Sequence, residues 1–153
     1  MRLGLTDDQL AIKEVFAGFF GKESTPAVVR ASEPGGFDAK LWRRVCETGA
    51  PGMGVGEGMG GGGASLGDLA VVAEEFGRSI APIPLIDHQV AARTLAALDQ
   101  VRTDVTEGET LASLALRPAV NGVWWLVPGG SVTGLTVGLD GDELVAVEGA
   151  PPA

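Results

Sequence analysis

The sequence predicts an α+β protein, with an N-terminal helical bundle followed by a small antiparallel β region. Up to about residue 102, apolar residues recur at helical spacing between capping residues, glycines and prolines. After that point short apolar or alternating runs are separated by Pro128-Gly129-Gly130 and Asp140-Gly141, which are turn signals. We therefore predict a helical domain over 1–102 and a partial β domain over 103–153, which ends in a proline-rich stretch.

Each of the first three predicted helices begins at a residue whose side chain can cap free backbone amides. These capping residues are Thr6, Thr25 and Asp38. The first helix carries its own capping box with Gln9, and we expect it to end at Gly21. Pro26 stands at the first position of the second, short helix. The third helix is expected to stop at Gly49.

A glycine-rich loop and a fourth helix follow. From Gly49 to Gly63, nine of the fifteen residues are glycine, which predicts a loop whose backbone segments approach closely. Ser65 caps the next helix, and Asp68 lies in its first turn, where the helix dipole favours a carboxylate. We expect Gly77 to end this helix in the left-handed conformation.

The remaining elements are a fifth helix and four short strands. The helix is expected over 85–98, after the prolines Pro82 and Pro84. The strands are expected over 110–116, 122–127, 131–138 and 143–147. Of the neighbours Trp124 and Trp125, one ring should be buried and the other exposed or at an interface, because adjacent strand residues face opposite ways. The predicted helical core consists of Phe16, Phe20, Leu41, Trp42, Leu69, Val72 and Phe76.

Composition excludes several functional classes. The net charge is −9, and residues 103–153 hold one basic and seven acidic side chains. Such a surface repels phosphates, so we expect neither nucleic-acid binding nor attachment to an anionic membrane. No apolar run reaches the roughly 20 residues of a membrane span. Cys46 is the only cysteine, and the N-terminus carries acidic residues where a signal peptide would be basic, so we expect a cytoplasmic protein.

Two motif matches favour structural roles. Gly63 to Gly67 matches the G-x-S-x-G nucleophile elbow, but a glycine run precedes Ser65 where a strand is required, so we interpret Ser65 as a helix cap. Gly56 to Gly61 matches G-x-G-x-x-G, which is nearly unavoidable in so glycine-rich a loop.

Single titratable residues receive structural interpretations too. We expect Cys46 to be a small buried hydrophobe and His88, the only histidine, to be a surface or capping residue. Glu74 and Glu75 diverge on their helix, so we expect them to form a solvated face or one half of an interface salt bridge with Arg78. No catalytic or metal-binding residue is assigned.

One family pattern is visible across these elements. The order is a helix, Gly-Ala-Pro-Gly, a loop with Glu57 and clustered glycines, Ser65, Asp68, and then the helix end Ala-Glu-Glu-Phe-Gly-Arg over 73–78. It resembles the N-terminal helical domain of acyl-CoA dehydrogenases, in which a "P-E-E-Y-G-G-x-G" loop leads to a helix ending "E-E-L-G-R". The proline and tyrosine of that loop are absent here. The resemblance extends from about Leu5 to Leu98.

The resemblance implies a three-part protein: a helical domain, a β domain and a C-terminal bundle, with FAD between the last two. In the family a glutamate of the bundle removes the α-proton of an acyl-CoA and the flavin takes a hydride. The family's flavin segment, "A-x-T-E-P-x-A-G-S-D", falls on 115–121 here, with Leu116 and Arg117 in place of threonine and glutamate. These two residues are the candidate cofactor-binding positions of a degenerate flavin loop.

Three hypotheses follow for the function. The chain is the front part of an acyl-CoA dehydrogenase-like protein, or a stand-alone assembly module for a flavin-bearing partner subunit, or an unrelated helical binding domain. We favour the first. FAD and acyl-CoA are then expected in the complete homo- or hetero-oligomeric assembly, while this chain alone is expected to bind no FAD and to be inactive. The acyl group, fatty or steroid, stays open.

Overall fold

The computed structural model describes residues 4–149, which contain six α-helices, two short 3₁₀ helices and three strands. This confirms the predicted α+β class. The chain divides into two compact units, one made of the residues up to Trp42 with Ala64–Ile83, the other of Arg43–Gly63 with the residues from Pro84 onward. The division at residue 102 that composition suggests stays a prediction.

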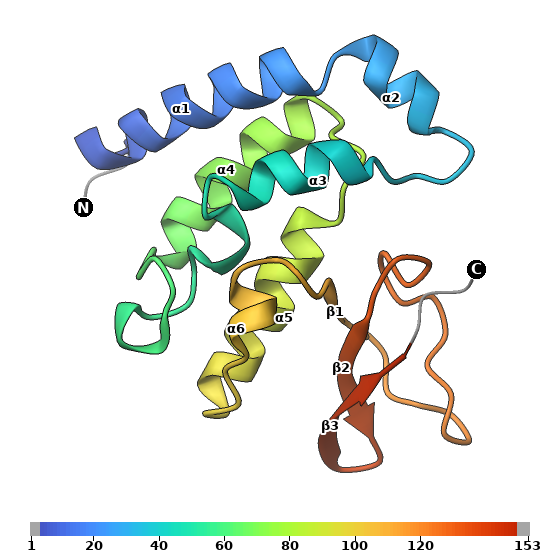
Figure 1. Ribbon diagram of the computed structural model, residues 1–153. Coiled ribbons are helices and arrows are strands. Elements are labelled where there is room, and N and C mark those ends of the chain that lie inside the picture. The colour runs from blue at the N-terminus through green and yellow to red at the C-terminus, as the bar shows by residue number, and fades with distance from the viewer. Residues whose placement is uncertain (1–3, 150–153) are drawn as a thin grey trace. The chain divides into compact units, whose positions relative to one another are not determined.

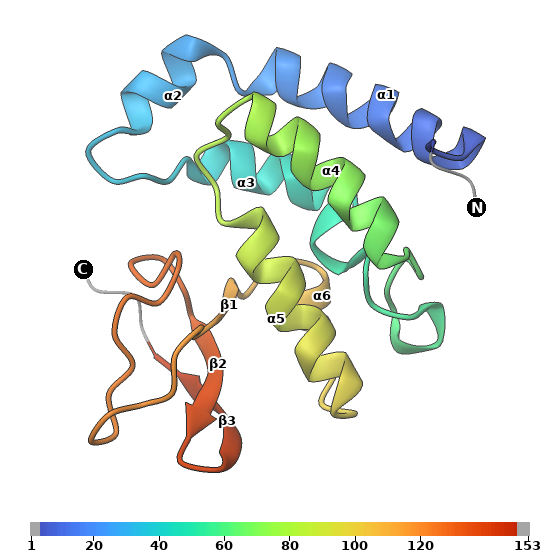
Figure 2. The same cartoon turned by 180° about the vertical axis from the view of Figure 1, so that it is seen from behind.

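The first unit is helical. It contains α1 (Asp7–Glu23), α2 (Pro26–Ser32), the start of α3 (Ala39–Cys46) and α4 (Leu66–Arg78). α1 and α4 lie side by side (Figures 1 and 2). Six of the seven predicted core residues are buried: Phe16, Phe20, Leu41, Trp42, Leu69 and Val72. Phe76 is only partly buried, and its ring meets that of Phe20 edge-on at 5.9 Å.

The predicted N-terminal caps are confirmed. Thr6 forms its capping box with Gln9, and Ser65 forms a second one with Asp68. Gln9 Nε2 also donates to Asp68 Oδ1 at 3.1 Å, which joins the starts of α1 and α4. The two capping boxes therefore fix the same end of this helix pair.

Two predicted helix ends are wrong. α1 runs through Gly21 to Glu23, and α4 runs through Gly77 to Arg78. A glycine inside a helix costs only about 1 kcal/mol, which packing of the flanking turns can offset. The residue that takes positive φ after α4 is Ile80, at 47°.

The second unit combines helices with a mixed sheet. It contains η1 (Ala50–Gly52), η2 (Glu57–Met59), α5 (Leu85–Ala97), α6 (Thr103–Thr106), β1 (Ala112–Leu114), β2 (Leu135–Asp140) and β3 (Glu143–Glu148). α5 packs on β1. The core of this unit consists of Val55, Ala91, Ala92, Leu95, Val105, Ala112, Leu135 and Val137. The four-residue α6 was not predicted.

The sheet order is β1-β2-β3. β2 and β3 are antiparallel and close at Asp140↔Glu143, which confirms the hairpin predicted from Asp140-Gly141. β1 and β2 are parallel, which differs from the all-antiparallel prediction. The strand predicted over 122–127 is wrong, because positive φ at Asn121 and Leu126 interrupts the extended chain.

The glycine-rich loop packs as tightly as predicted. A Cβ on Gly61 would collide with the backbone oxygens of Val55 and Gly52. A Cβ on Gly52 would lie 2.5 Å from the carbonyl oxygen of Thr106. Glycine is therefore required at both positions by close approach. Within residues 4–149, no helix has the length and apolar character needed to cross a bilayer.

Candidate functional site

The candidate flavin residues lie in an exposed bend after β1. Leu116 is 73% exposed, and Arg117 is exposed beside it. The amides that flank the bend are used by β2, since Ala115 N–H donates to Val137 O at 2.7 Å and Ala119 N–H to Leu139 O at 2.8 Å. The bend thus offers one cation and an aliphatic side chain. This donor set does not fit a flavin loop, which needs hydroxyls and free amides, so we derive no step through FAD.

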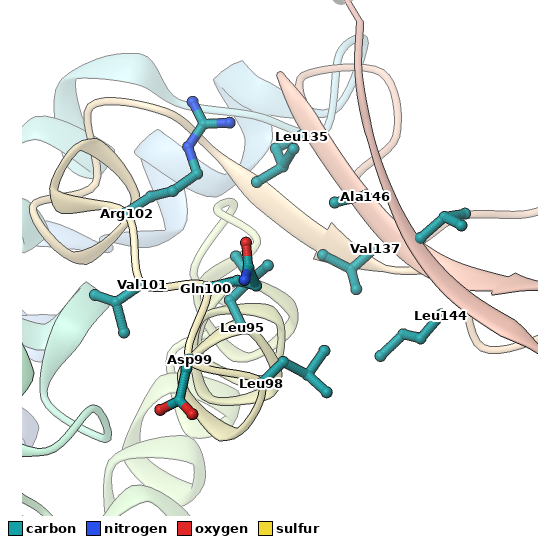
Figure 3. A pocket seen from close by; sticks show the side chains of 11 residues that line it. Leu95, Leu98, Asp99, Gln100, Val101, Arg102, Leu135, Val137, Leu144 and Ala146 are labelled. Carbon is teal, nitrogen blue, oxygen red and sulfur yellow. The ribbon is translucent and has the colours of Figure 1, made fainter.

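A cavity of about 460 Å³ lies between the end of α5 and the β2–β3 hairpin. Its apolar lining comes from both sides: Leu95, Leu98, Leu135, Val137, Leu144 and Ala146 (Figure 3). Polar residues of the α5–α6 connection, Asp99, Gln100 and Arg102, complete it. Figure 3 shows the guanidinium of Arg102 and the carboxylate of Asp99 turned away from the apolar side chains.

The strand register explains which sheet face lines the cavity. Leu135, Val137 and Leu139 share one face of β2 because side chains alternate along a strand. Their partners on β3 are Glu148, Ala146 and Leu144. Leu135 and Val137 are 1% exposed, whereas Leu139 and Leu144 toward the turn are 42% and 37% exposed. The face is therefore covered at one end of the hairpin and open at the other.

Arg102 binds two carboxylates at the cavity's polar end. It contacts Asp104 through two hydrogen bonds, of 2.8 and 3.1 Å, and it pairs with Glu148 at the end of β3. Hydrogen bonding to Arg102 lowers the pKa of Asp104 to about 2, and both carboxylates raise the pKa of Arg102. One cation facing two anions leaves no excess positive charge for an anionic ligand.

Trp124 covers the opposite face of the sheet. Its Nε1 donates to Leu139 O at 2.8 Å, and its ring lies over Gly138, where a Cβ would come within 2.9 Å of the indole. Trp125 is 68% exposed. The exposed ring of Trp125 was expected, whereas Trp124 is only partly buried where a buried ring was expected, and neither residue lies in a strand.

His88 was expected at the surface and is completely buried. Its Nδ1 accepts from Ala112 N–H at 3.0 Å, so the neutral ring carries its proton on Nε2 and donates to Val105 O at 2.9 Å. Burial lowers the pKa of His88 to about 4. The ring thereby joins α5, α6 and β1, and its nitrogens are engaged by backbone.

Cys46 and Ser65 also have structural roles. Cys46 is partly buried, its Sγ lies 3.8 Å from Gly108 O, and burial raises its pKa to about 11. A thiol with so high a pKa is a poor nucleophile at neutral pH. Ser65 Oγ accepts from Asp68 N–H at 3.3 Å, which confirms its role as a cap, and it also donates to Asp68 Oδ2 at 2.7 Å. No strand precedes Ser65 in the described chain.

The two glutamates of α4 differ from each other. Glu74 is exposed and pairs with Arg78 at 2.6 Å, and this hydrogen bond, followed by one from Lys13, lowers its pKa. Glu75 is only 6% exposed, so of the two expected alternatives the solvated face is wrong for it and the ion pair with Arg78 is confirmed. Its Oε1 lies 3.6 Å from Lys13 Nζ and 3.5 Å from Arg78 Nε. Among residues 4–149 no group of three or more possible metal ligands converges.

Sequence reasoning missed the cavity and the Arg102 cluster. The Arg-Thr-Asp run at 102–104 is a local signal for half of that cluster. The other half, Glu148, is 46 positions away and is placed only by the hairpin register.

Comparison with known proteins places these elements in a family. Residues 6–104 match the family described as acyl-CoA dehydrogenase, N-terminal domain. Acyl-CoA dehydrogenase IpdE2 of Mycobacterium tuberculosis is 34% identical over 125 residues, which are 76% of this chain and 39% of that protein. IpdE2 of Mycolicibacterium smegmatis is 28% identical over 92% of this chain and 45% of its own length.

A solved structure has the same fold. A chain in the crystal structure of the ChsE4–ChsE5 complex from Mycobacterium tuberculosis superimposes with a TM-score of 0.78 at 18% identity, over 98% of this chain and 49% of that one. The chain thus spans less than half the length of these relatives. Because the family match covers well over half of its residues, the chain belongs to the acyl-CoA dehydrogenase family.

Proposed function

We propose that this chain supplies the N-terminal helical domain and the beginning of the β domain in an acyl-CoA dehydrogenase assembly. The reaction of the assembly is α,β-dehydrogenation of an acyl-CoA thioester with FAD. The family match over residues 6–104 carries the proposal. It coincides with the helices of the chain and includes the capped α1–α4 pair.

The chemical step belongs elsewhere in the assembly. Dehydrogenation needs a base beside the α-carbon and donors around the flavin. The bend at Leu116 and Arg117 lacks those donors, and the carboxylates of Asp104 and Glu148 pair with Arg102, which lines the cavity. In the family the base lies in the C-terminal bundle. The remaining part of the protein or a flavin-bearing acyl-CoA dehydrogenase subunit therefore provides both, and this chain alone holds no FAD and turns over no acyl-CoA.

Exposed apolar side chains support assembly with such a subunit. They gather in the connection between β1 and β2: Leu116, Val120, Val123, Trp125 and Leu126. An exposed tryptophan next to several exposed aliphatic residues is typical of a protein interface. The fold likeness to a chain of the two-protein ChsE4–ChsE5 complex is consistent with a hetero-oligomer.

A stand-alone assembly module is the second candidate, and the same exposed residues favour it. The two hypotheses predict different masses for the native chain. An intact native chain of 15.6 kDa in cell extract would support the module and contradict the front-part hypothesis.

Co-expression tests the proposal directly. The chain purified alone should be colourless, and acyl-CoA oxidation with an artificial electron acceptor should appear only when a flavin-bearing subunit is co-expressed. Trp125→Ala should weaken co-purification of that subunit, whereas Leu66→Ala, a matched exposed change in α4, should not. Stoichiometric FAD on the chain alone, or turnover by it, would contradict the proposal.

A further inference from the structure

The two halves of the glycine-rich loop are held in different ways. We call the first half, residues 50–55, the base. Gln89 of α5 donates through Nε2 to Ala50 O at 2.8 Å, and this hydrogen bond is buried. One helical turn later, Arg93 Nη1 donates to Gly54 O, also at 2.8 Å. Two side chains of α5 therefore fix the path of the base.

The second half of the loop, residues 56–63, buries hardly any side chain. We call it the flap. Six of its eight residues are glycine, and its two side chains, those of Glu57 and Met59, are exposed. Burial of apolar side chains is the main source of free energy that holds a segment in place. The flap lacks this source, whereas the base ends in Val55, which is 1% exposed in the core of its unit.

Two backbone hydrogen bonds join the flap to the base. Gly62 N–H donates to Gly52 O at 3.2 Å, and Gly63 N–H donates to Val55 O at 2.8 Å. The bonds around η2 lie within the flap, so they persist when the flap moves as a unit. Since water replaces a lost partner, each backbone bond changes an equilibrium constant by no more than about tenfold. The closed flap is therefore favoured over an open one by at most about a hundredfold.

The flap forms part of the wall of a second cavity, of about 420 Å³. The cavity lies between the loop and the end of α6, and its lining includes Cys46, Gly52, Thr106, Gly60, Gly61 and Gly62. All of its lining residues precede β1 in the chain, so none of them belongs to the sheet. Movement of the flap away from the base would widen this cavity on the side of the three flap glycines.

We propose that the flap opens locally while the rest of the protein stays folded, and that its opening controls access to the cavity beside Cys46. This goes beyond the proposed function, which requires no motion of the loop. Local opening is expected of a segment with few buried side chains and an exposed backbone. The base stays in place because α5 holds Ala50 and Gly54, and it provides the surface on which the flap closes.

Amide hydrogen exchange of the ¹⁵N-labelled chain tests the local opening. The amides of Gly62 and Gly63 should be protected by no more than about a hundredfold, the effect of two backbone bonds. The amides of Val72 in α4 and Ala92 in α5 should be at least about ten times better protected, because they exchange when the core unfolds. Low concentrations of urea should speed exchange of the two core amides only, since local opening exposes little surface.

Two alanine substitutions in the flap form a matched pair. A Cβ on Gly61 would collide with two backbone oxygens of the base, so Gly61→Ala should force the flap open. A Cβ on Gly58 would lie in open space among the described residues, so Gly58→Ala is the control. Gly61→Ala should lower the protection of Gly62 and Gly63 at least about tenfold, while the control should leave it unchanged.

Cys46 reports on access to the cavity. It is the only cysteine, so alkylation by iodoacetamide, followed by intact mass, measures this thiol alone. The thiol is partly buried and should react slowly in the unchanged protein. Gly61→Ala should speed the reaction about tenfold, because the open fraction rises, and Gly58→Ala should not.

Three results would overturn the proposal. One is exchange of Gly62 and Gly63 at the rate of Ala92 and with the same dependence on urea, because the loop would then open only when the protein unfolds. Another is equal protection of these two glycines in Gly61→Ala and Gly58→Ala. The third is an alkylation rate of Cys46 that is the same in both variants, because the flap would then not control access to the cavity. The exchange measurement on the unchanged protein is decisive even if Gly61→Ala fails to fold.

Discussion

Lowering the pH from 7.5 to 5.5 should destabilise this protein through one residue, His88. The ring is completely buried, its Nδ1 accepts from Ala112 N–H, and its Nε2 faces Val105 O. Protonating Nδ1 would put a proton against the amide hydrogen of Ala112 and a charge in the core. The folded protein therefore resists protonation, while the unfolded chain does not.

The direction and the size of this loss of stability follow from the pKa values of His88 in the unfolded chain and in the folded protein. Burial lowers the pKa from 6.5 to about 4 in the folded protein. Between these values the unfolded chain binds the proton and the folded protein does not, so stability is full above about pH 6.5 and falls as the pH drops toward 4. The difference between the two pKa values corresponds to about 3 kcal/mol in the free energy of unfolding. About 1.3 kcal/mol of this should be lost between pH 7.5 and 5.5.

Urea denaturation at a series of pH values measures this loss. Because His88 is the only histidine, no other imidazole contributes in that range. The matched control is His88→Gln, whose amide can donate to Val105 and accept from Ala112 but does not titrate. We expect the control to have a nearly flat stability between pH 7.5 and 5.5.

Two results would refute this reasoning. One is a His88 ring that titrates near 6.5 in the folded protein by NMR. The other is a decrease in stability between pH 7.5 and 5.5 that is the same in His88→Gln. Either result would mean that the ring is not held neutral by Val105 and Ala112.

Three further changes test the packing. Trp42→Ala should lower the free energy of unfolding, measured in urea, by about 3–5 kcal/mol, because Trp42 is only 5% exposed. A decrease below about 1 kcal/mol would contradict that burial. Ser65→Ala should cost about 1 kcal/mol, and labelling of Ser65 by a fluorophosphonate probe would disprove its role as a cap. Gly138→Ala should cost about 1–3 kcal/mol and shift the fluorescence of Trp124, and unchanged emission would show that this ring does not lie over Gly138.

The sequence by itself determined the elements that depend on near neighbours. Ser65 and Asp68 form the predicted capping box, and Asp140-Gly141 forms the predicted hairpin turn, because both patterns join residues three apart. The helical core was also predictable, since Phe16 and Phe20 lie one turn apart on a single face. For the same reason the family resemblance is visible from motifs in the capped helices and the glycine loop.

Only the tertiary structure decided the pairings between distant residues. β1 lies parallel to β2 because the long connection between them returns the chain to the same end of the sheet. His88 is buried because Val105 and Ala112, 17 and 24 positions later, supply its two partners. The cavity exists because the α5 end and the hairpin face each other across many intervening residues. Local patterns carry no information on such contacts, since their free energy comes from burial and from partners that folding brings together.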